Sequence, residues 1–404
     1  MRIAVFSDSI NIPPKEGINV HTYDLLIALA KHPDCTPVLV VCDRGWLSHD
    51  VLKEQLFDTI LLPERNFYNV EYISEFLARH QFDIAQSYMT YFGAVVLGPA
   101  AYAANIPCVA ELHDLEESVV SVYFTAAELP QATRDHTAFQ KQAAKYASLV
   151  RVMSRDDYTS VRETWPDYDE QRYMWMPVSR PATNITGHSK PDCIGYIGNM
   201  SYAPNAEGAQ IIRDTIAPLC NYKITFIGRG SEDYGSPSIN ALGMVDDIEP
   251  ILANMAIGLA PILQGSGMKI KNLTYLSHGI PLITTTLGAR GFPESEAIII
   301  EDNFARWPSI IHRLMTNGEE RRRLSKIASR LFAEHFDIEN TVHRLIIQYQ
   351  VAVDQYPKRK AKLLNPSAAQ YTEIDLRHVY WLRELRETGE GATKEELLIE
   401  GREH

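Results

Sequence analysis

The stretch from Pro261 to Pro281, PILQGSGMKIKNLTYLSHGIP, places glycines and lysines in an order suited to binding phosphate. It reads as the end of a strand, a Gly-Ser-Gly turn and a short helix. Gly265 and Gly267 let the backbone approach a ligand closely, and the first amides of the helix have no partner within it. Lys269 and Lys271 add cations where a helix start already favours anions. We therefore predict a phosphate-binding loop; the alternative is a Gly-rich turn with two solvated lysines.

His113 is the second candidate, because it follows the apolar run 107–112 and precedes Asp114. In parallel sheets ligands bind beyond the carboxyl ends of the strands. A lone histidine at such a place is more often structural than catalytic. Asp114 would either fix the tautomer of His113 or cap the next helix. Glu111 becomes an acid/base candidate only if its strand turns it inward.

Other polar residues give weaker signals. Arg229, in a Gly-Arg-Gly turn after an apolar run, is either a phosphate or base contact or a surface arginine. Acidic pairs such as Asp246-Asp247 are typical of helix starts and solvated surfaces. No His, Cys or acidic cluster has metal-ligand spacing, so we predict no metal site and no cofactor. The five cysteines are scattered without a CxxC spacing, which favours reduced core residues.

Apolar runs separated by helical patterns recur along most of the chain. Runs of this kind between amphipathic segments predict parallel strands covered by helices on both faces. Because the alternation restarts after a polar stretch, we predict an α/β protein with two doubly wound, Rossmann-like domains facing a central cleft. The predicted strands are 3–6, 38–42, 59–62, 82–86, 107–112, 149–153, 173–178, 194–197, 224–227, 239–242, 257–260, 281–285 and 297–300.

The polar stretch SRPATNITGHSKPD sets the predicted domain boundary. We predict an N-terminal domain over 1–178, a linker over 179–192 and a C-terminal domain over 193–338. A helix over 339–357 is expected to pack back across the domains. The tail over 358–404 carries an amphipathic pattern at 371–387, where both signs of charge favour a docking or oligomer face over a membrane anchor.

The charge balance bears on partners and location. A formal net charge of −12 without a long Lys/Arg block argues against nucleic acid as a partner. The run KRKAK at 358–362 is interpreted as a solvated helix face, with contact to an anionic membrane surface as the alternative. No apolar run reaches the roughly 18 residues of a membrane span, and MRIAVFSDSI does not resemble a signal peptide. We expect a cytoplasmic protein, peripheral at the membrane in the alternative.

Several motifs together resemble the GT-B fold glycosyltransferases, and most closely glycosyltransferase family 4, over roughly residues 1–355. In the second half the matching segments are GYIGNMSYAPNAEGAQII, KITFIGRGSED, GMVDDIEPILANMAIGLAPI and GSGMKIKNLTYLSHGIPLITTTLGARGF. In the first half, PPKEGINVHTYDLLIALA resembles the family's glycine-containing loop and first helix. PCVAELHD resembles the strand that ends in an active-site histidine.

The resemblance implies a nucleotide-sugar donor whose diphosphate is held by the loop 265–271. It implies catalytic roles for His113, Ser266 and Lys271, with His113 contacting the transferred sugar. Lysines at this loop would stabilise charge on the leaving diphosphate. The residues implied to bind the donor are Gly17, Gly198, Asn199, Arg229, Met244, Val245, Gly265, Gly267, Met268, Lys269 and Thr274.

This chain departs from the family pattern at several of these positions. A glutamate that binds the ribose hydroxyls is usual where Thr274 stands, and a second glutamate near the sugar is common where Ser266 stands. Asn199 lies in a loop where many members place Arg and Lys against the diphosphate, and would act as a neutral donor. The resemblance assigns base recognition to the backbone of Met244 and Val245.

The leading hypothesis is a glycosyltransferase of glycan or glycoconjugate biosynthesis, moving a sugar from a nucleoside-diphosphate sugar to a glycan, lipid-linked or small-molecule acceptor. The resemblance implies retention of the anomeric configuration without a metal ion. One alternative is a retired GT-B protein acting as a partner subunit or sugar-binding protein, suggested by Thr274 and by the tail, where residues 371–387 could bind a partner protein or a second copy of the chain. Another is a nucleotide-sugar epimerase on the same fold, which would need carboxylate acid/base groups in the cleft.

Overall fold

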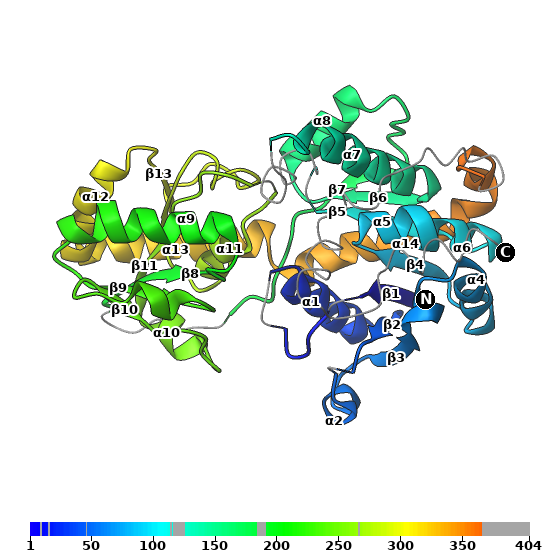
Figure 1. The fold of residues 1–404 in the computed structure, drawn as a ribbon, viewed down its shortest axis with the longest axis horizontal. Coiled ribbons are helices and arrows are strands. Elements are labelled where there is room, and N and C mark those ends of the chain that lie inside the picture. The colour runs from blue at the N-terminus through cyan, green and yellow to red at the C-terminus, as the bar shows by residue number, and fades with distance from the viewer. Residues whose placement is uncertain are drawn as a thin grey trace. The chain divides into compact units, whose positions relative to one another are not determined.

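The computed structural model describes residues 1–8, 10–14, 17–45, 47–113, 115, 126–183, 191–265 and 267–365. These residues form two compact units, each built on one parallel sheet (Figure 1). The first unit contains Met1–Met176 and the chain from Val342 onward, and the second contains Pro177–Thr341. The predicted α/β class with two Rossmann-like domains is confirmed.

The first unit has seven parallel strands in the order β3-β2-β1-β4-β5-β6-β7. The chain starts at the middle of the sheet, winds to one edge, and returns to build the other side. Ligands bind where such a sheet reverses direction, here beside the ends of β1 and β4. The strands are β1 (Arg2–Ser7), β2 (Thr36–Asp43), β3 (Asp58–Pro63), β4 (Ile84–Ser87), β5 (Cys108–Leu112), β6 (Leu149–Val152) and β7 (Tyr173–Trp175).

Helices cover this sheet because their apolar positions recur at helical spacing. In α4, for example, Asn69 accepts a hydrogen bond from the amide of Tyr72 at the helix start, and Ile73, Phe76 and Leu77 are buried. The helices of the unit are α1 (Gly17–Lys31), α2 (His49–Lys53), α3 (Glu64–Phe67), α4 (Val70–Arg79), α5 (Thr90–Phe92), α6 (Gly98–Ala103), α7 (Leu129–Tyr146), α8 (Arg155–Thr164) and most of α14 (Ile338–Arg359).

The second unit repeats the arrangement with six parallel strands in the order β10-β9-β8-β11-β12-β13. Its direction reverses between β8 and β11. The strands are β8 (Cys193–Ile197), β9 (Ile224–Ile227), β10 (Ile239–Ala241), β11 (Met255–Ala260), β12 (Leu282–Thr284) and β13 (Ile298–Ile300). The helices are α9 (Ala203–Ile211), α10 (Glu249–Ala253), α11 (Ile270–Ser277), α12 (Trp307–Thr316) and α13 (Gly318–His335).

The chain returns to the first unit through α14, which begins in the second unit and continues beyond Val342 in the first. The basic run at the end of α14 differs from the sequence interpretation. Arg359 is buried, with its guanidinium donating to the carbonyls of Ser148 and Gln171, so this residue is not on a solvated face. The predicted amphipathic segment 371–387 lies outside the described residues.

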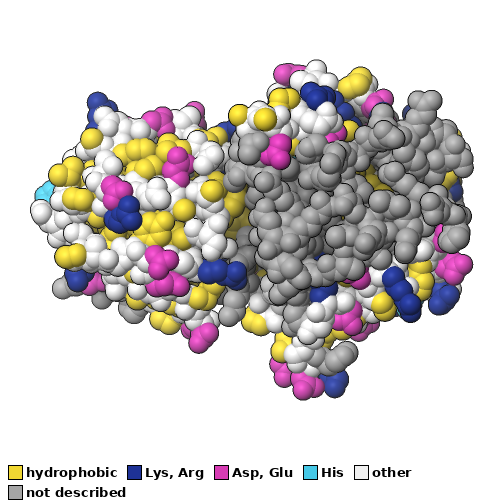
Figure 2. All heavy atoms as spheres, viewed as in Figure 1, with side chains coloured by type: hydrophobic (Ala, Val, Ile, Leu, Met, Phe, Trp, Pro, Cys, Tyr) yellow, Lys and Arg dark blue, Asp and Glu magenta, His cyan; other side chains and the backbone are white. Residues whose placement is uncertain are grey.

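Charged side chains of both signs are interspersed with apolar ones on the described part of the face shown in Figure 2. None of the described helices combines the length and the apolar character needed to cross a membrane.

Candidate functional site

Tyr275 fixes α11, the helix that follows the glycine-rich loop, against the second sheet. Its ring lies where a Cβ at Gly258 of β11 would be, 2.5 Å from the nearest ring atom, so only glycine fits there. Its hydroxyl accepts a hydrogen bond from the amide of Ile197 at 3.0 Å and lies 3.3 Å from the carbonyl oxygen of Gly195. Tyr275 therefore sets the position of α11, and with it Lys271, relative to β8 and β11.

The loops after β8 and β9 approach each other closely. The backbone of Gly228 has a φ of +124°, and a Cβ there would lie 2.0 Å from the carbonyl oxygen of Gly198. The amide of Met200 donates to the carbonyl of Arg229 at 2.8 Å, and the amide of Gly228 donates to the carbonyl of Gly243 at 2.8 Å. The predicted donor-binding loops around Gly198, Arg229 and Met244 are thus joined through their backbones.

Lys271 is connected to the loop after β8 through Asn205 of α9. Its Nζ donates to Oδ1 of Asn205 at 2.7 Å, and Nδ2 of Asn205 donates to the carbonyl of Asn199 at 2.9 Å. The same Nζ lies 4.6 Å from the ring centre of Tyr196, a cation–π distance. Burial, with a smaller contribution from the charge of Lys269, lowers the pKa of Lys271 to about 7. The structure therefore brings together Gly198, Asn199 and Lys271.

The hydroxyl of Thr274 is occupied by contacts within the second unit. It accepts a hydrogen bond from Nη1 of Arg180 at 2.8 Å and donates to the carbonyl of Ile270 at 3.1 Å. A guanidinium thus contacts the side chain at the position where the resemblance implies a carboxylate. Arg180 was not among the predicted site residues, because it lies in the predicted linker.

The remaining donor-side predictions have the following positions. Gly265 and Gly267 have φ of +104° and +63°, left-handed conformations that glycine adopts readily. Met268 is buried, Lys269 is the residue before α11, and Met244 is exposed, with Val245 partly so. Ser266, predicted as catalytic, lies outside the described residues, as does Asp114 beside His113.

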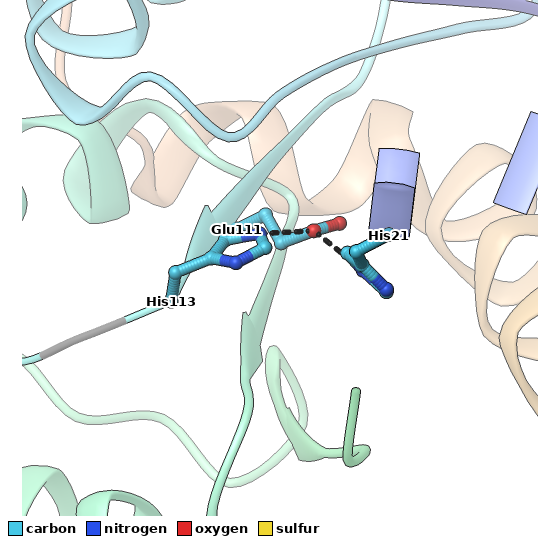
Figure 3. Close-up of side chains that lie close together, drawn as sticks. All are labelled: His21, Glu111 and His113. Atoms are coloured by element: carbon cyan, nitrogen blue, oxygen red, sulfur yellow. Dashed lines mark hydrogen bonds and ion pairs between the residues drawn. The ribbon is translucent and has the colours of Figure 1, made fainter. Parts of the chain in front are cut away.

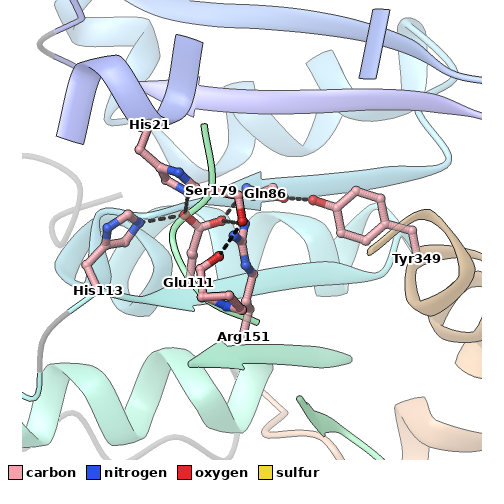
Figure 4. Close-up of polar contacts among 8 residues, drawn as sticks. His21, Gln86, Glu111, His113, Arg151, Ser179 and Tyr349 are labelled. Atoms are coloured by element: carbon pink, nitrogen blue, oxygen red, sulfur yellow. Dashed lines mark hydrogen bonds and ion pairs between the residues drawn. The ribbon is translucent and has the colours of Figure 1, made fainter. Parts of the chain in front are cut away.

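The first unit has a buried polar network centred on Glu111 of β5 (Figure 4). Arg151 is its register partner on β6, and Gln86 lies on β4. Oε2 of Glu111 accepts from Nε2 of Gln86 at 2.6 Å and from Nη1 of Arg151 at 3.0 Å. Tyr349 of α14 donates in turn to Oε1 of Gln86. Glu111 therefore points inward, as an acid/base group would, but it is fully engaged by protein donors.

Two histidines complete the network (Figure 3). Nε2 of His113 lies 2.5 Å from Oε1 of Glu111, and Nε2 of His21 lies 3.2 Å from the same oxygen. His21 belongs to α1, one turn after Gly17, one of the residues implied to bind the donor. The two imidazole rings are 5.3 Å apart, and Tyr88 packs its ring 5.8 Å from His113.

Charge decides the protonation of this network. Burial alone would raise the pKa of Glu111, but Arg151 and His113 outweigh it and hold that pKa well below its ordinary value. Burial lowers the pKa of His21 to about 4, more than Glu111 raises it. The carboxylate is therefore ionised and His21 is neutral at ordinary pH. Sequence reasoning missed His21, Gln86 and Arg151; polar residues in otherwise apolar elements were the available signal.

His21, Glu111 and His113 also offer donors of the kind that bind zinc, within 4.8 Å of one another. Two ligands of one tetrahedral zinc ion would lie roughly 3.3 Å apart, since each is about 2.0–2.1 Å from the metal. His113 and Glu111 are closer than that, at 2.5 Å. A divalent ion would also lie beside the buried guanidinium of Arg151, which already balances the carboxylate. The residues fit a hydrogen-bond network better than a metal centre.

Comparisons with known proteins agree with this architecture. Residues 191–317 match the family model described as Glycosyl transferases group 1. No curated protein sequence matches the chain.

Among solved structures, HepE of Anabaena in complex with UDP and glucose has a TM-score of 0.68 at 14% identity, covering 87% of this chain and 100% of that one. TarM of S. aureus has a TM-score of 0.68 at 9% sequence identity, and the match covers 86% of this chain and 98% of that one. A glycosyltransferase from Rickettsia africae has a TM-score of 0.63 at 13% sequence identity, and the match covers 87% of this chain and 98% of that one. The shared fold confirms the predicted GT-B fold, and the family match over residues 191–317 agrees with the predicted glycosyltransferase class.

Proposed function

We propose that this chain, a GT-B glycosyltransferase whose residues 191–317 match group 1, transfers a sugar from a nucleoside-diphosphate sugar to a hydroxyl of an acceptor. The observation that carries the proposal is the arrangement around Lys271. An ammonium held by Asn205 and the Tyr196 ring stands at the start of a helix, beside the glycine-rich loop. Such a group suits a diphosphate, because charge-assisted hydrogen bonds to phosphate are roughly twice as strong as neutral ones.

The proposed reaction retains the anomeric configuration and needs no metal ion. The bond between the anomeric carbon and the diphosphate oxygen breaks, and a bond from the acceptor oxygen forms on the same face. The acceptor's proton passes to the departing phosphate oxygen. Lys271 stabilises the negative charge that develops there. The protein's part is to orient the groups and stabilise charge, which is consistent with Glu111 being occupied by Arg151 and Gln86.

The first test is a binding panel of UDP, GDP, ADP, CMP and dTDP by thermal shift and calorimetry, in the presence of EDTA. Selective binding of one diphosphate, followed by turnover of its sugar, is expected. Binding without turnover would favour the retired, sugar-binding alternative, and interconversion of donor sugars without transfer would favour the epimerase. Failure of every nucleotide to bind would reject the proposal.

Replacing His113 with alanine is expected to lower turnover by about ten- to a hundredfold while leaving nucleoside diphosphate affinity within twofold. The reason is that His113 is proposed to contact the sugar, and one lost hydrogen bond in the transition state costs about 1–3 kcal/mol. Steady-state kinetics and calorimetry measure the two effects. A matched control is His335→Ala at the exposed end of α13, which should change neither. Unchanged turnover in His113→Ala would remove this residue from the proposed site.

Introducing the family's usual carboxylate tests the donor role of position 274. In Thr274→Glu, the new carboxylate is expected to pair with Arg180, so UDP affinity stays within about twofold of the wild type. In the double variant Arg180→Ala/Thr274→Glu the carboxylate is free for ribose hydroxyls, and a gain of roughly five- to tenfold is expected. Calorimetry measures the UDP affinity of each variant, with Arg180→Ala alone as the control. An equal gain in the single and double variants would show that Arg180 does not hold this position.

A further inference from the structure

The two carboxylate oxygens of Glu111 have different partners (Figure 4). Oε2 accepts hydrogen bonds from Gln86 and Arg151, and the contacting nitrogen of each can only donate. Oε1 faces Nε2 of His21 and Nε2 of His113. An ionised carboxylate has no hydrogen to give, so each histidine must supply the hydrogen from its own Nε2.

We propose that Glu111 is a positioning residue that holds His113 as its Nε2–H tautomer, so that Nδ1 of His113 accepts a hydrogen bond from a substrate hydroxyl. The substrate half of this statement rests on the proposed function. The tautomer half rests only on the contacts of the first unit. Glu111 itself does not touch the substrate, because its two oxygens are already committed.

The other nitrogen of His113 is the one left for a ligand. No residue that the structure describes forms a hydrogen bond with Nδ1 of His113. The His113 side chain is 16% exposed, whereas that of Glu111 is 1% exposed. Of these two residues, His113 is therefore the one that solvent or a ligand can reach. The rings of His21 and Tyr88 flank it at 5.3 and 5.8 Å and restrict its rotation. A ring held in this way, with one lone pair that no described residue uses, selects a group that can donate a hydrogen bond.

The proposed tautomer is a neutral imidazole and not an imidazolium. The negative charge of Glu111 is already balanced by Arg151, whose side chain is fully buried. The carboxylate of Glu111 therefore does not need a positive charge on His113 to be neutralised. A neutral His113 can accept at Nδ1, while an imidazolium could only donate. A neutral His113 therefore recognises a hydroxyl through the hydrogen that this hydroxyl donates.

Glu111→Gln tests the tautomer because the amide has one acceptor and one donor. Gln86 and Arg151 both donate, so the amide oxygen is expected to face them, and the NH2 group then faces the two histidines. His113 must then accept at Nε2, which moves its hydrogen to Nδ1. Nitrogen-15 histidine NMR of the whole chain reports the tautomer directly, with His113→Asn identifying the signal.

The expected result is a neutral Nε2–H signal for His113 in the wild type and an Nδ1–H signal in Glu111→Gln. The matched control Glu75→Gln, on the exposed side of α4, should keep the wild-type signal. An Nδ1–H or imidazolium signal in the wild type at pH 7.5 would overturn the inference, even if the Gln variant does not fold. These spectra need no substrate, so they decide the tautomer whether or not the proposed function stands.

The substrate half is tested with the donor that the nucleotide panel identifies, using its monodeoxy and monofluoro sugar analogues. Fluorine can accept weakly but cannot donate. When the hydroxyl that contacts His113 is replaced, kcat/KM of the wild type is expected to be about fivefold or more lower with either analogue than with the natural donor. In His113→Ala, the analogues and the natural donor are expected to have nearly the same kcat/KM. A fluoro analogue that restores the rate would mean that His113 donates, which would reject the acceptor role. If no nucleotide-sugar donor is found, the proposed function is rejected and the substrate half of this proposal with it. The tautomer half would still be decided by the spectra.

Discussion

Replacing Glu111 with alanine is expected to destabilise the first unit by about 3–5 kcal/mol, because it leaves Arg151 as an uncompensated buried charge. Both side chains are essentially inaccessible, at 1% and 0% exposure. Gln86 would lose an acceptor at the same time. Since the chain has two units, hydrogen exchange is a better measurement than a single melting temperature. Protection should fall in β5 and β6 and remain unchanged in β11.

The pH dependence of this effect follows from the lowered pKa of Glu111. A carboxyl whose folded pKa is depressed stabilises the fold fully above its unfolded pKa of about 4.3. That contribution is lost as pH falls through the lower folded pKa. The difference between the wild type and Glu111→Ala should therefore be constant near neutrality and shrink in strong acid.

The matched control is Glu75→Ala, which removes an exposed partner of Arg79 at 3.8 Å in the same unit. Such pairs contribute about 0–1 kcal/mol, so little change is expected. Equal effects of the two substitutions would contradict the assignment of Glu111 as the neutralising partner of Arg151. The double variant Glu111→Leu/Arg151→Met should recover much of the lost stability, since apolar groups can replace a buried pair.

Replacing Lys271 with alanine is expected to weaken nucleoside diphosphate binding by roughly ten- to a hundredfold, as hydrogen bonds to charged groups contribute about 1.5–3 kcal/mol. Binding of the nucleoside without phosphates should hardly change. Calorimetry with UDP and uridine, or the matching pair for the nucleotide that binds, measures the difference. Lys326→Ala on the exposed face of α13 is the control and should affect neither ligand. Equal losses for nucleotide and nucleoside would reject the phosphate role.

The lowered pKa of Lys271 adds a pH signature. With a pKa of about 7, the ammonium loses its proton in the free protein as pH rises above neutrality. The diphosphate binds the protonated form, so affinity should fall by up to about tenfold per pH unit above 7. Lys271→Arg remains charged and should flatten this dependence. Identical pH profiles for the wild type and the Arg variant would show that Lys271 does not titrate on binding.

The fold was largely predictable because its strands are continuous apolar runs. All thirteen predicted strands occur, most within one or two residues of their expected ends. For β9 the predicted and observed range 224–227 is the same. Buried parallel strands leave few alternatives for such segments, since both faces must be apolar. Helix 339–357 was also expected, and occurs as Ile338–Arg359. Its division between two units depends on long-range packing that local sequence patterns do not encode.

The candidate site was predictable only in part. The glycine and lysine spacing identified the loop before α11, because backbone geometry and charge there are local properties. The partners of those residues were missed. Tyr196 and Asn205 lie in the segment GYIGNMSYAPNAEGAQII, and Arg180 lies in the predicted linker, but all three are distant in sequence from the residues they contact. His113 was found, but the residue facing its Nε2 is Glu111, two positions earlier on the strand. Which face a strand turns inward is settled by packing.

The discontinuity of the first unit has a consequence for synthesis on the ribosome. Residues 177–341 emerge as one uninterrupted piece, so the second unit can fold as soon as it clears the exit tunnel. The first unit emerges earlier but stays unfinished until α14 arrives. Tyr349, which donates to Gln86 beside Glu111, belongs to that late segment. The polar network that holds His113 is therefore completed only after the second unit has been synthesised, so the unit that begins earlier in the chain matures later.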